Sequence, residues 1–346
     1  MDKFLIKKYM AIVVCLITTF VIISISAVLA YNFTLAGQDI SLAESGELNG
    51  IYTQNGGNAD IDEEVAANTL PDLHIMVLGI DDEASLPDLI MMLVYDGTNN
   101  LIDVISVPRD TQITITPEER ALLNEANRWA PNHGVVKLNE LHSHGGPIGH
   151  ILVAGRLEQI FDIEIDYYVI LDLDALEYMV DMVGGIYMDI RPQGIYYNQG
   201  GTIDINIPGG RQLLTGNMAQ QVVRFRQMPM GDLDRIRLQQ QFMGEFFVQV
   251  LGRENIMNNL AALLTTFITH VRTDFGLFSA LRYLDAVPAL NPDSIDFHMT
   301  PGVARDAANP EGRVRSYYFI DEAAARELMN EIKEENAVQA EFINRP

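Results

Sequence analysis

The feature of this 346-residue chain that most limits how it can fold is an apolar, uncharged run near the N-terminus. Lysines lie among the first eight residues, and no charged residue then occurs before Asp39. At about 1.5 Å per residue, a helix over residues 10–30 crosses a hydrocarbon core of about 30 Å. Because the lysines precede it, we predict a single-pass membrane anchor over residues 9–31, with residues 1–8 in the cytoplasm and the remainder extracytoplasmic.

A cleaved signal peptide is the alternative, because "VLA" ending at Ala30 can serve as a cleavage site. Cys15, the only cysteine, lies in the apolar run, so an exported domain forms no disulfides, which suits a bacterial envelope protein. Residues 32–71 are polar, acidic and rich in Gly and Asn, and we interpret them as an extracytoplasmic linker.

The composition indicates a globular, acidic protein. The chain is 48% hydrophobic and 20% charged, which argues against wholesale disorder. It has 23 Lys and Arg against 47 Asp and Glu, a formal charge of −24. Nucleic-acid binding needs a basic face that releases counterions, so general nucleic-acid binding is excluded.

Beyond the linker, short apolar runs alternate with segments of helical period, which predicts a mixed α/β fold: a central mixed β-sheet with helices on both faces. We expect one domain over 72–255, with a helical and strand extension over 256–346 packed on it. Predicted strands are 73–81, 165–174, 186–190 and 294–299, with a hairpin at 89–107 around "DGTNN". Predicted helices are 120–130, 148–161, a helix ending at Gly184-Gly185, 231–253, 256–270, 275–286 and 321–335.

The predicted helix at 231–253 carries polar residues on its inward face. At 100° per residue, Asp232, Arg235 and Gln239 fall on the side of the apolar stripe, whereas Arg237 points to solvent. That stripe contains Ile236, Met243, Phe246 and Phe247. Unpaired buried charge is expensive, so these residues need partners. The partner is either an anion or, more simply, an Asp232–Arg235 pair at i,i+3.

Three other segments place charges at candidate sites. Arg224 and Arg226 leave one face of an extended segment, where an anion between them relieves their repulsion; a pair of surface arginines is the alternative. Arg109 and Asp110 follow a buried strand in "ISVPRDT", as a ligand site or a structural ion pair. Asp81 and Asp88 flank a short loop, where they can hold Mg²⁺ or simply be solvated. The "HSHGG" segment (142–146) is expected to be a glycine-rich loop, and Trp129 a core or interface residue.

The order and spacing of these segments resembles a known family. The pattern is "LGID…PD…ISVPRD…K(L)N…GG…DYYVILDLD…VDMVGGIYMDI…PGGRQLLTGNMAQQVVRFR…GDLDRIRLQQQF". Over about residues 73–250 it is similar to the LytR–CpsA–Psr family of bacterial envelope proteins, and the predicted anchor also agrees with that family's topology.

The resemblance implies a function and roles for the charged residues. The expected activity is transfer of a glycopolymer from an undecaprenyl-pyrophosphate carrier to a peptidoglycan hydroxyl during cell-wall biogenesis, forming a phosphodiester. It implies a catalytic domain over 72–255, an apolar tunnel for the lipid tail, and Mg²⁺ or Mn²⁺ held by Asp81 and Asp88. The implied catalytic residues are Arg109, Asp110, Arg224, Arg226 and Arg235. The implied substrate-binding residues are Arg109, Arg224, Arg226, Asp232, Arg235 and Gln239.

The chain departs from the family pattern at two positions. Leu86 and Leu238 stand where arginines are usual, which removes cations from the expected pyrophosphate site. Two other functions therefore remain open: a prenyl-pyrophosphate hydrolase that uses the same arginines with water as acceptor, and a non-catalytic envelope regulator that keeps the fold. For the proton acceptor, Asp81 and Asp110 are both candidates.

Overall fold

The structure is a computed structural model. It describes residues 70–80, 86–198, 204–225, 232–250, 270–276, 279, 283 and 294–343. The predicted anchor and linker lie outside these residues, as do most residues of the predicted helices at 256–270 and 275–286. Within the described part of the chain, no helix is both long and apolar enough to span a membrane.

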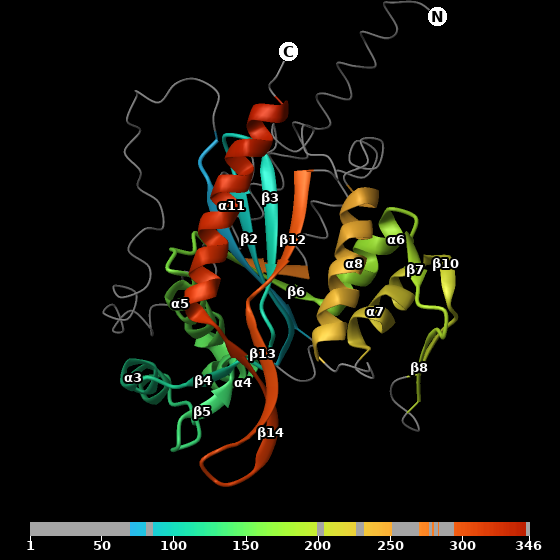
Figure 1. Cartoon of the computed structure of the whole chain (residues 1–346). Coiled ribbons are helices and arrows are strands. Elements are labelled where there is room, and N and C mark those ends of the chain that lie inside the picture. The colour runs from blue at the N-terminus through green and yellow to red at the C-terminus, as the bar shows by residue number, and fades with distance from the viewer. Residues whose placement is uncertain are drawn as a thin grey trace, which may run out of the picture. The chain divides into compact units, whose positions relative to one another are not determined.

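The central element is a six-stranded sheet in the order β11-β6-β1-β2-β3-β12 (Figure 1). It is mixed: β1 is parallel to β6 and β3 to β12, whereas the other neighbours are antiparallel. The strands are β1 (Leu73–Ile80), β2 (Pro87–Asp96), β3 (Leu101–Ser106), β6 (Tyr167–Asp172), β11 (Val271–Thr273) and β12 (Ile295–Met299). The predicted mixed α/β fold is confirmed, and so is the hairpin, whose turn places Asn100 at φ 58°.

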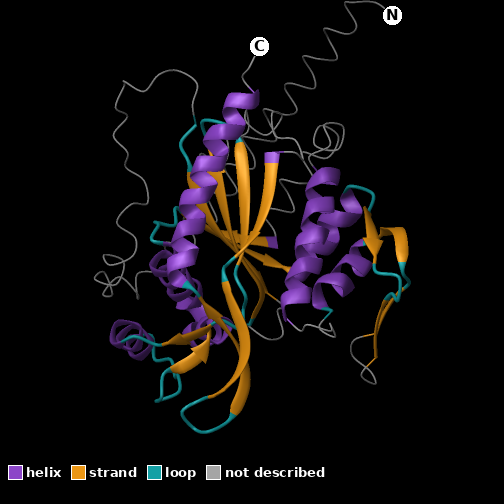
Figure 2. Cartoon of the chain, viewed as in Figure 1, coloured by secondary structure: helices purple, strands orange, loops and turns teal. Residues whose placement is uncertain are grey.

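Helices cover both faces of this sheet (Figure 2). On one face, α4 (Leu138–Gly145), α5 (Gly149–Phe161) and α11 (Glu322–Ile343) bury the largest apolar cluster against β1, β2 and β3. On the other face, α8 (Asp232–Val250) packs Met243 and Phe247 against Met91, Val104 and Ile295. The two-sided burial explains why these strands are almost continuously apolar.

A second apolar cluster lies between α8 and the segment that follows β6. Its elements are α6 (Leu173–Met182), β7 (Ile186–Ile190), β8 (Ile195–Asn198), β9 (Asp204–Ile207), β10 (Gly210–Leu214) and α7 (Gly216–Arg224). The predicted glycine stop after α6 is confirmed, because Gly184 and Gly185 have φ of 82° and 94°. Only glycine adopts such angles without strain. A Cβ at Gly185 would also lie 2.8 Å from the Leu214 carbonyl oxygen.

One local prediction was wrong, one was narrowed, and one element was not predicted. The "HSHGG" segment is mostly helical, because His142 to Gly145 form the last turn of α4, with His142 buried. Of the two alternatives for Trp129, a core or an interface residue, its 70% exposure excludes the first. The pattern also did not predict the hairpin of β13 (Gly302–Ala308) and β14 (Val314–Ile320), which projects beside β4 (Gln112–Thr114) and β5 (Val135–Lys137) (Figure 1).

A buried polar network connects α11 to the sheet. Asp103 of β3 accepts hydrogen bonds from His298 of β12 at 2.7 Å and from Asn336 of α11 at 2.9 Å. The hydrogen bond to Asp103 raises the pKa of His298, and the nearby Asp296 and Glu335 act in the same direction. Because Asp103 is 3% exposed, these hydrogen bonds replace the contacts with water that a buried carboxylate loses.

The raised pKa gives the folding stability a pH dependence of predictable sign. A group whose pKa rises on folding stabilises fully below its unfolded value, about 6.5 for histidine, and this contribution fades as pH rises through the folded pKa. We expect His298→Gln to cost about 1–3 kcal/mol at pH 6, and less at pH 9. Urea unfolding at both pH values measures this difference. An equal cost at both values contradicts the assignment.

Candidate functional site

The site begins at the C-terminal end of β3, where "VPRD" leaves the sheet. The carbonyls of Arg109, Asp110 and Thr111 all accept backbone hydrogen bonds. The three donors, in that order, are the amides of Asn139 (3.2 Å), Tyr318 (2.9 Å) and Leu138 (2.9 Å). The first turn of α4 and strand β14 therefore fix the backbone of this loop.

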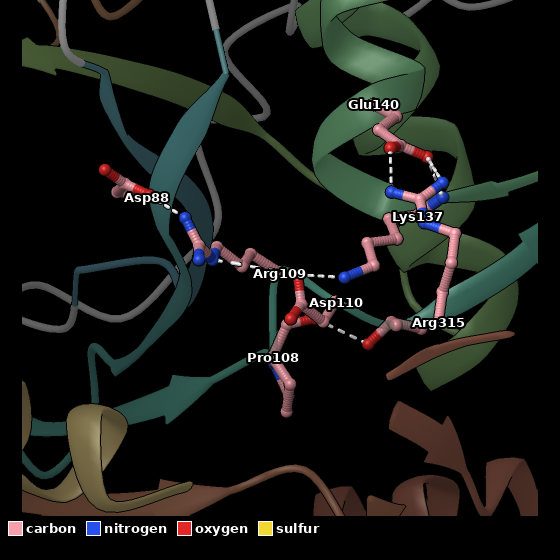
Figure 3. Close-up of polar contacts among 8 residues, drawn as sticks. Asp88, Pro108, Arg109, Asp110, Lys137, Glu140 and Arg315 are labelled. Carbon is pink, nitrogen blue, oxygen red and sulfur yellow. Dashed lines mark hydrogen bonds and ion pairs between the residues drawn. The ribbon is translucent and has the colours of Figure 1, made fainter. Parts of the chain in front are cut away.

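Four side chains form a row of alternating charge across this loop (Figure 3). Arg109 forms an ion pair with Asp88 of β2, and its Nε atom lies 3.7 Å from Asp110 Oδ1. The same Asp110 oxygen lies 3.1 Å from Lys137 Nζ. All four side chains are less than 20% exposed. Low exposure strengthens these attractions, so the row holds Arg109 and Asp110 in one arrangement.

Glu140 and Arg315 continue the arrangement (Figure 3). Two guanidinium nitrogens of Arg315 donate to the two carboxylate oxygens of Glu140, at 2.5 and 3.2 Å. Burial raises the pKa of the Glu140 carboxyl, but the hydrogen bonds from Arg315 and the Lys137 backbone outweigh it, so the pKa lies below its usual value. The hydrogen bond to Glu140 in turn raises the pKa of Arg315. Neither residue was among the predicted site residues.

The predicted orientation of the helix at 231–253 is confirmed by α8 for Arg235, Gln239 and Arg237, whereas the Asp232 side chain lies outside the described part of the structure. Arg235 and Gln239 are both 3% exposed, whereas the Arg237 side chain is 59% exposed and lies 3.3 Å from Asp234. Gln239 donates from Nε2 to the carbonyl of Val223 at 3.2 Å, immediately before Arg224. In this structure Gln239 therefore ties α8 to the end of α7, a positioning contact that the sequence pattern did not indicate.

Arg224 is the last residue of α7 rather than part of an extended segment. Phe225 follows in an extended conformation and is 1% exposed. The Nε atoms of Arg109, Arg224 and Arg235 are all buried. Of the other predicted site residues, Arg226 and Asp81 lie outside the described residues, and Asp232 is the first residue of α8.

Gln240 is a second positioning residue that the sequence pattern did not single out. Its Nε2 atom donates to Ser106 Oγ at 3.0 Å and to the His298 carbonyl at 2.8 Å. Ser106 ends β3, three positions before Arg109. This side chain therefore ties the helix that carries Arg235 to the strand that delivers Arg109.

Of the predicted metal pair Asp81 and Asp88, the structure describes only Asp88. Its carboxylate oxygens are hard ligands of the kind that Mg²⁺ prefers. That carboxylate is already ion-paired with Arg109. Within the described residues, no group of three or more His, Cys, Asp or Glu side chains is arranged to hold a metal. The described residues alone therefore do not make a metal site.

The two departures from the family pattern differ structurally. Leu238 is 8% exposed and belongs to the second apolar cluster, together with Val223 and Phe242. Leu86 directly precedes β2 and is partly exposed. An arginine at 238 in this packing would bury a charge among apolar side chains, so leucine suits the local core.

The architecture is that of a mixed α/β domain in which a row of charged side chains lies at the ends of β2 and β3, and Gln240 ties α8 to the end of β3. The LytR_cpsA_psr family model matches residues 45–334, and the chain belongs to this family. The protein is 26% identical over 215 residues to the regulatory protein MsrR of Staphylococcus aureus, a match that covers 60% of this chain and 58% of MsrR.

A second relative is the polyisoprenyl-teichoic acid–peptidoglycan teichoic acid transferase TagU of Bacillus cereus. It is 25% identical over 286 residues, covering 80% of this chain and 82% of TagU. The fold also matches the crystal structure of TagV from B. subtilis, with a TM-score of 0.59, 21% identity, and coverage of 77% of this chain and 96% of TagV. The structural likeness supports the fold described above.

Leu238→Arg tests whether position 238 can hold the arginine that the family pattern has there. We expect the variant to lose several kcal/mol of folding free energy, about 3–5 kcal/mol, because an unpaired charge enters an apolar cluster. Leu238→Met is the matched control and should cost less than about 1.5 kcal/mol. Thermal and urea unfolding measure both. A Leu238→Arg protein as stable as wild type would show that position 238 opens to a polar site.

Proposed function

We propose that this protein is a membrane-anchored transferase that moves a glycopolymer from an undecaprenyl-pyrophosphate carrier to a peptidoglycan hydroxyl, forming a phosphodiester. The observation that carries the proposal is that Arg109, Arg224 and Arg235 each have a buried Nε atom on segments that Gln239 and Gln240 tie together: the loop after β3, the end of α7 and the first turn of α8. Family membership and the transferase name of TagU support it. The apolar run at 9–31 supports an anchor that keeps the domain beside lipid-linked substrate.

The proposed chemistry is phosphoryl transfer, in which charge neutralisation and alignment dominate the barrier. Arginine forks bind phosphate oxygens in two-point contacts, so Arg109, Arg224 and Arg235 would hold the pyrophosphate together with Arg226. The acceptor oxygen attacks the glycan-linked phosphorus, the bond to the bridging oxygen breaks, and undecaprenyl phosphate leaves with the electron pair. The acceptor proton passes to a carboxylate, for which Asp110 and Asp81 are the candidates.

Of the two candidate bases, only Asp110 lies within the residues that the structure describes. Its side chain is 19% exposed and Oδ1 lies between Lys137 and Arg109. That environment keeps the carboxylate oriented, yet it also engages the oxygen that would accept a proton. A role in holding Arg109 therefore fits the observed contacts at least as well as proton transfer.

The main alternative is a regulator without transferase activity. The name of the MsrR relative favours it, and so does leucine at 86 and 238. A hydrolase that uses water as acceptor is the third possibility. Radiolabelled prenyl-pyrophosphate-linked glycan and a cell-wall acceptor separate the three: covalent wall product supports transfer, free glycan monophosphate without wall product supports hydrolysis, and binding without turnover supports regulation.

Arginine substitutions test the proposed pyrophosphate clamp, by which we mean Arg109, Arg224, Arg226 and Arg235. The assay uses the full chain in lipid vesicles, and the protein should sediment together with the vesicles. Arg224→Ala, Arg226→Ala and Arg235→Ala should each reduce turnover at least 100-fold, because each removes charge stabilisation of the leaving phosphate. Arg237→Ala is the control and should change turnover less than about threefold, because Arg237 faces solvent. Because Arg235 is buried, the Arg235→Ala variant is compared with Arg235→Lys, and a melting curve checks that both variants fold. Normal turnover by a folded Arg235→Ala protein would refute the clamp.

We further propose that Mg²⁺ or Mn²⁺ assists the reaction and that Asp81 and Asp88 bind it. Bound there, the ion would supply further charge neutralisation at the pyrophosphate. Turnover should fall at least tenfold after chelation and return on adding Mg²⁺, and Asp88→Asn should raise the Mg²⁺ concentration needed. Because Asp88 also pairs with Arg109, isothermal titration of Mg²⁺ in the presence of prenyl pyrophosphate is the direct measurement. Turnover unaffected by chelation contradicts the metal.

A further inference from the structure

The β13–β14 hairpin contacts the proposed site although its residues follow the motifs over residues 73–250 that indicated the family in the sequence. Tyr318 of β14 donates its amide proton to the Asp110 carbonyl at 2.9 Å, and Thr111 and Tyr318 form a parallel β-bridge. The Tyr318 hydroxyl donates to the Thr300 carbonyl at 2.7 Å, which fixes β14 to the end of β12. The position of β14 therefore sets the position of the Arg109–Asp110 loop.

One carboxylate, Glu140, connects this hairpin to α4. Both of its oxygens accept from Arg315 of β14, and Oε2 also accepts from the Lys137 backbone amide at 2.9 Å. Glu140 is the third residue of α4, so the Lys137 contact closes the first turn of that helix. The same turn supplies the amides of Leu138 and Asn139 to the loop carbonyls. Arg315 therefore braces the element that fixes the loop.

The Tyr317 ring supplies a second connection between Arg315 and the loop. The Lys137 ammonium and the Arg315 guanidinium each lie 5.8 Å from the ring centroid. Tyr317 is 1% exposed, and its hydroxyl has no hydrogen-bond partner among the described residues. The ring, not the hydroxyl, is thus what holds Lys137, whose Nζ atom lies 3.1 Å from Asp110 (Figure 3).

We propose that Arg315 is a positioning residue for the transfer reaction: through Glu140 and Tyr317 it holds Lys137 and β14 so that Arg109 and Asp110 meet the pyrophosphate in one geometry. The inference rests on the proposed function for the reaction it serves. Arg315 itself does not reach the reacting atoms; it acts through the loop.

A purely stabilising role makes a different prediction. The Arg315 and Glu140 side chains are 36% and 24% exposed, and ion pairs of such exposure contribute little to global stability. Reaction rates are far more sensitive, because small displacements of groups that align a phosphate lower the rate by orders of magnitude. Loss of Arg315 should therefore lower the rate much more than it lowers the melting temperature.

The kinetic test compares Arg315→Gln, Glu140→Gln and the double variant with wild type in the lipid-pyrophosphate transfer assay. We expect kcat to fall at least tenfold in each single variant, KM to change less than threefold, and the double variant to be no worse than the weaker single variant. Arg315→Lys should recover part of the rate, since it keeps the charge but loses the two-point contact. Additive losses in the double variant would show that the two residues do not act as a pair and would overturn the proposal.

Matched controls come from the same hairpin. Arg313 is 80% exposed at its side chain and has no contact with Glu140 in the described structure, so Arg313→Gln should leave kcat unchanged. Tyr317→Phe removes only the unpartnered hydroxyl and should also leave kcat unchanged, whereas Tyr317→Leu removes the ring face and should lower it. A loss of activity in Tyr317→Phe equal to that in Tyr317→Leu would contradict the role given to the ring.

Amide exchange separates failure of this inference from failure of the proposed function. The amides of Leu138, Asn139 and Tyr318 donate to the loop, so Arg315→Gln should speed their hydrogen–deuterium exchange at least tenfold relative to Arg313→Gln. This readout needs no substrate. If the wild-type protein transfers no glycan, the proposed function fails, but the exchange rates still test whether Arg315 positions the Arg109–Asp110 loop. If exchange at the three amides is the same in both variants, the positioning role is wrong.

Discussion

The ion pair between Arg109 and Asp88 is the contact on which the rest of the site depends. It joins the end of β3 to the start of β2, two strands whose other residues face a largely apolar core. Removing one partner of such a pair leaves a buried charge and costs about 3–5 kcal/mol, so the loss of either side chain should destabilise the fold. Around this pair the chain arranges two further ion pairs, Asp110 with Lys137 and Glu140 with Arg315. The result is a polar row that tolerates burial because every charge has a neighbour of opposite sign.

Sequence periodicity predicted the inward face of α8, but it did not predict the long-range contacts that hold the site in place. The inward placement of Arg235 and Gln239 followed from a 3.6-residue period sustained over α8, a local signal that tertiary packing reinforces. The apolar runs and the turn between them likewise predicted the β2–β3 hairpin. By contrast, Glu140 and Arg315 are 175 positions apart, and nothing local to either residue marks the pair. The glycines and histidines at 142–146 are weak helix formers and predict a loop, whereas the Glu140 cap and tertiary contacts stabilise the last turn of α4 there.

The exposure of the two leucines bears on how far this chain departs from other members of the family. Leu238 packs beside Phe242 in the second apolar cluster, on the helix whose inward face also carries Arg235. In that packing the helix gains apolar contact where a further cation would need an anionic partner. Arg237, the neighbouring arginine, lies against Asp234 in solvent and does not replace it. Among the described residues, the proposed anion site therefore relies on Arg109, Arg224 and Arg235.

The region after residue 293 supports the site through contacts that its sequence does not predict. β12 extends the central sheet, His298 and Asn336 satisfy the buried Asp103, and the His298 carbonyl receives Gln240 from α8. β14 supplies the amide that binds Asp110 and the guanidinium that binds Glu140. Both loop and clamp helix are thereby held from the C-terminal segment. Because the groups that would align the phosphate must stay within fractions of an ångström, a chain with fewer cations gains most from holding those that remain in fixed positions.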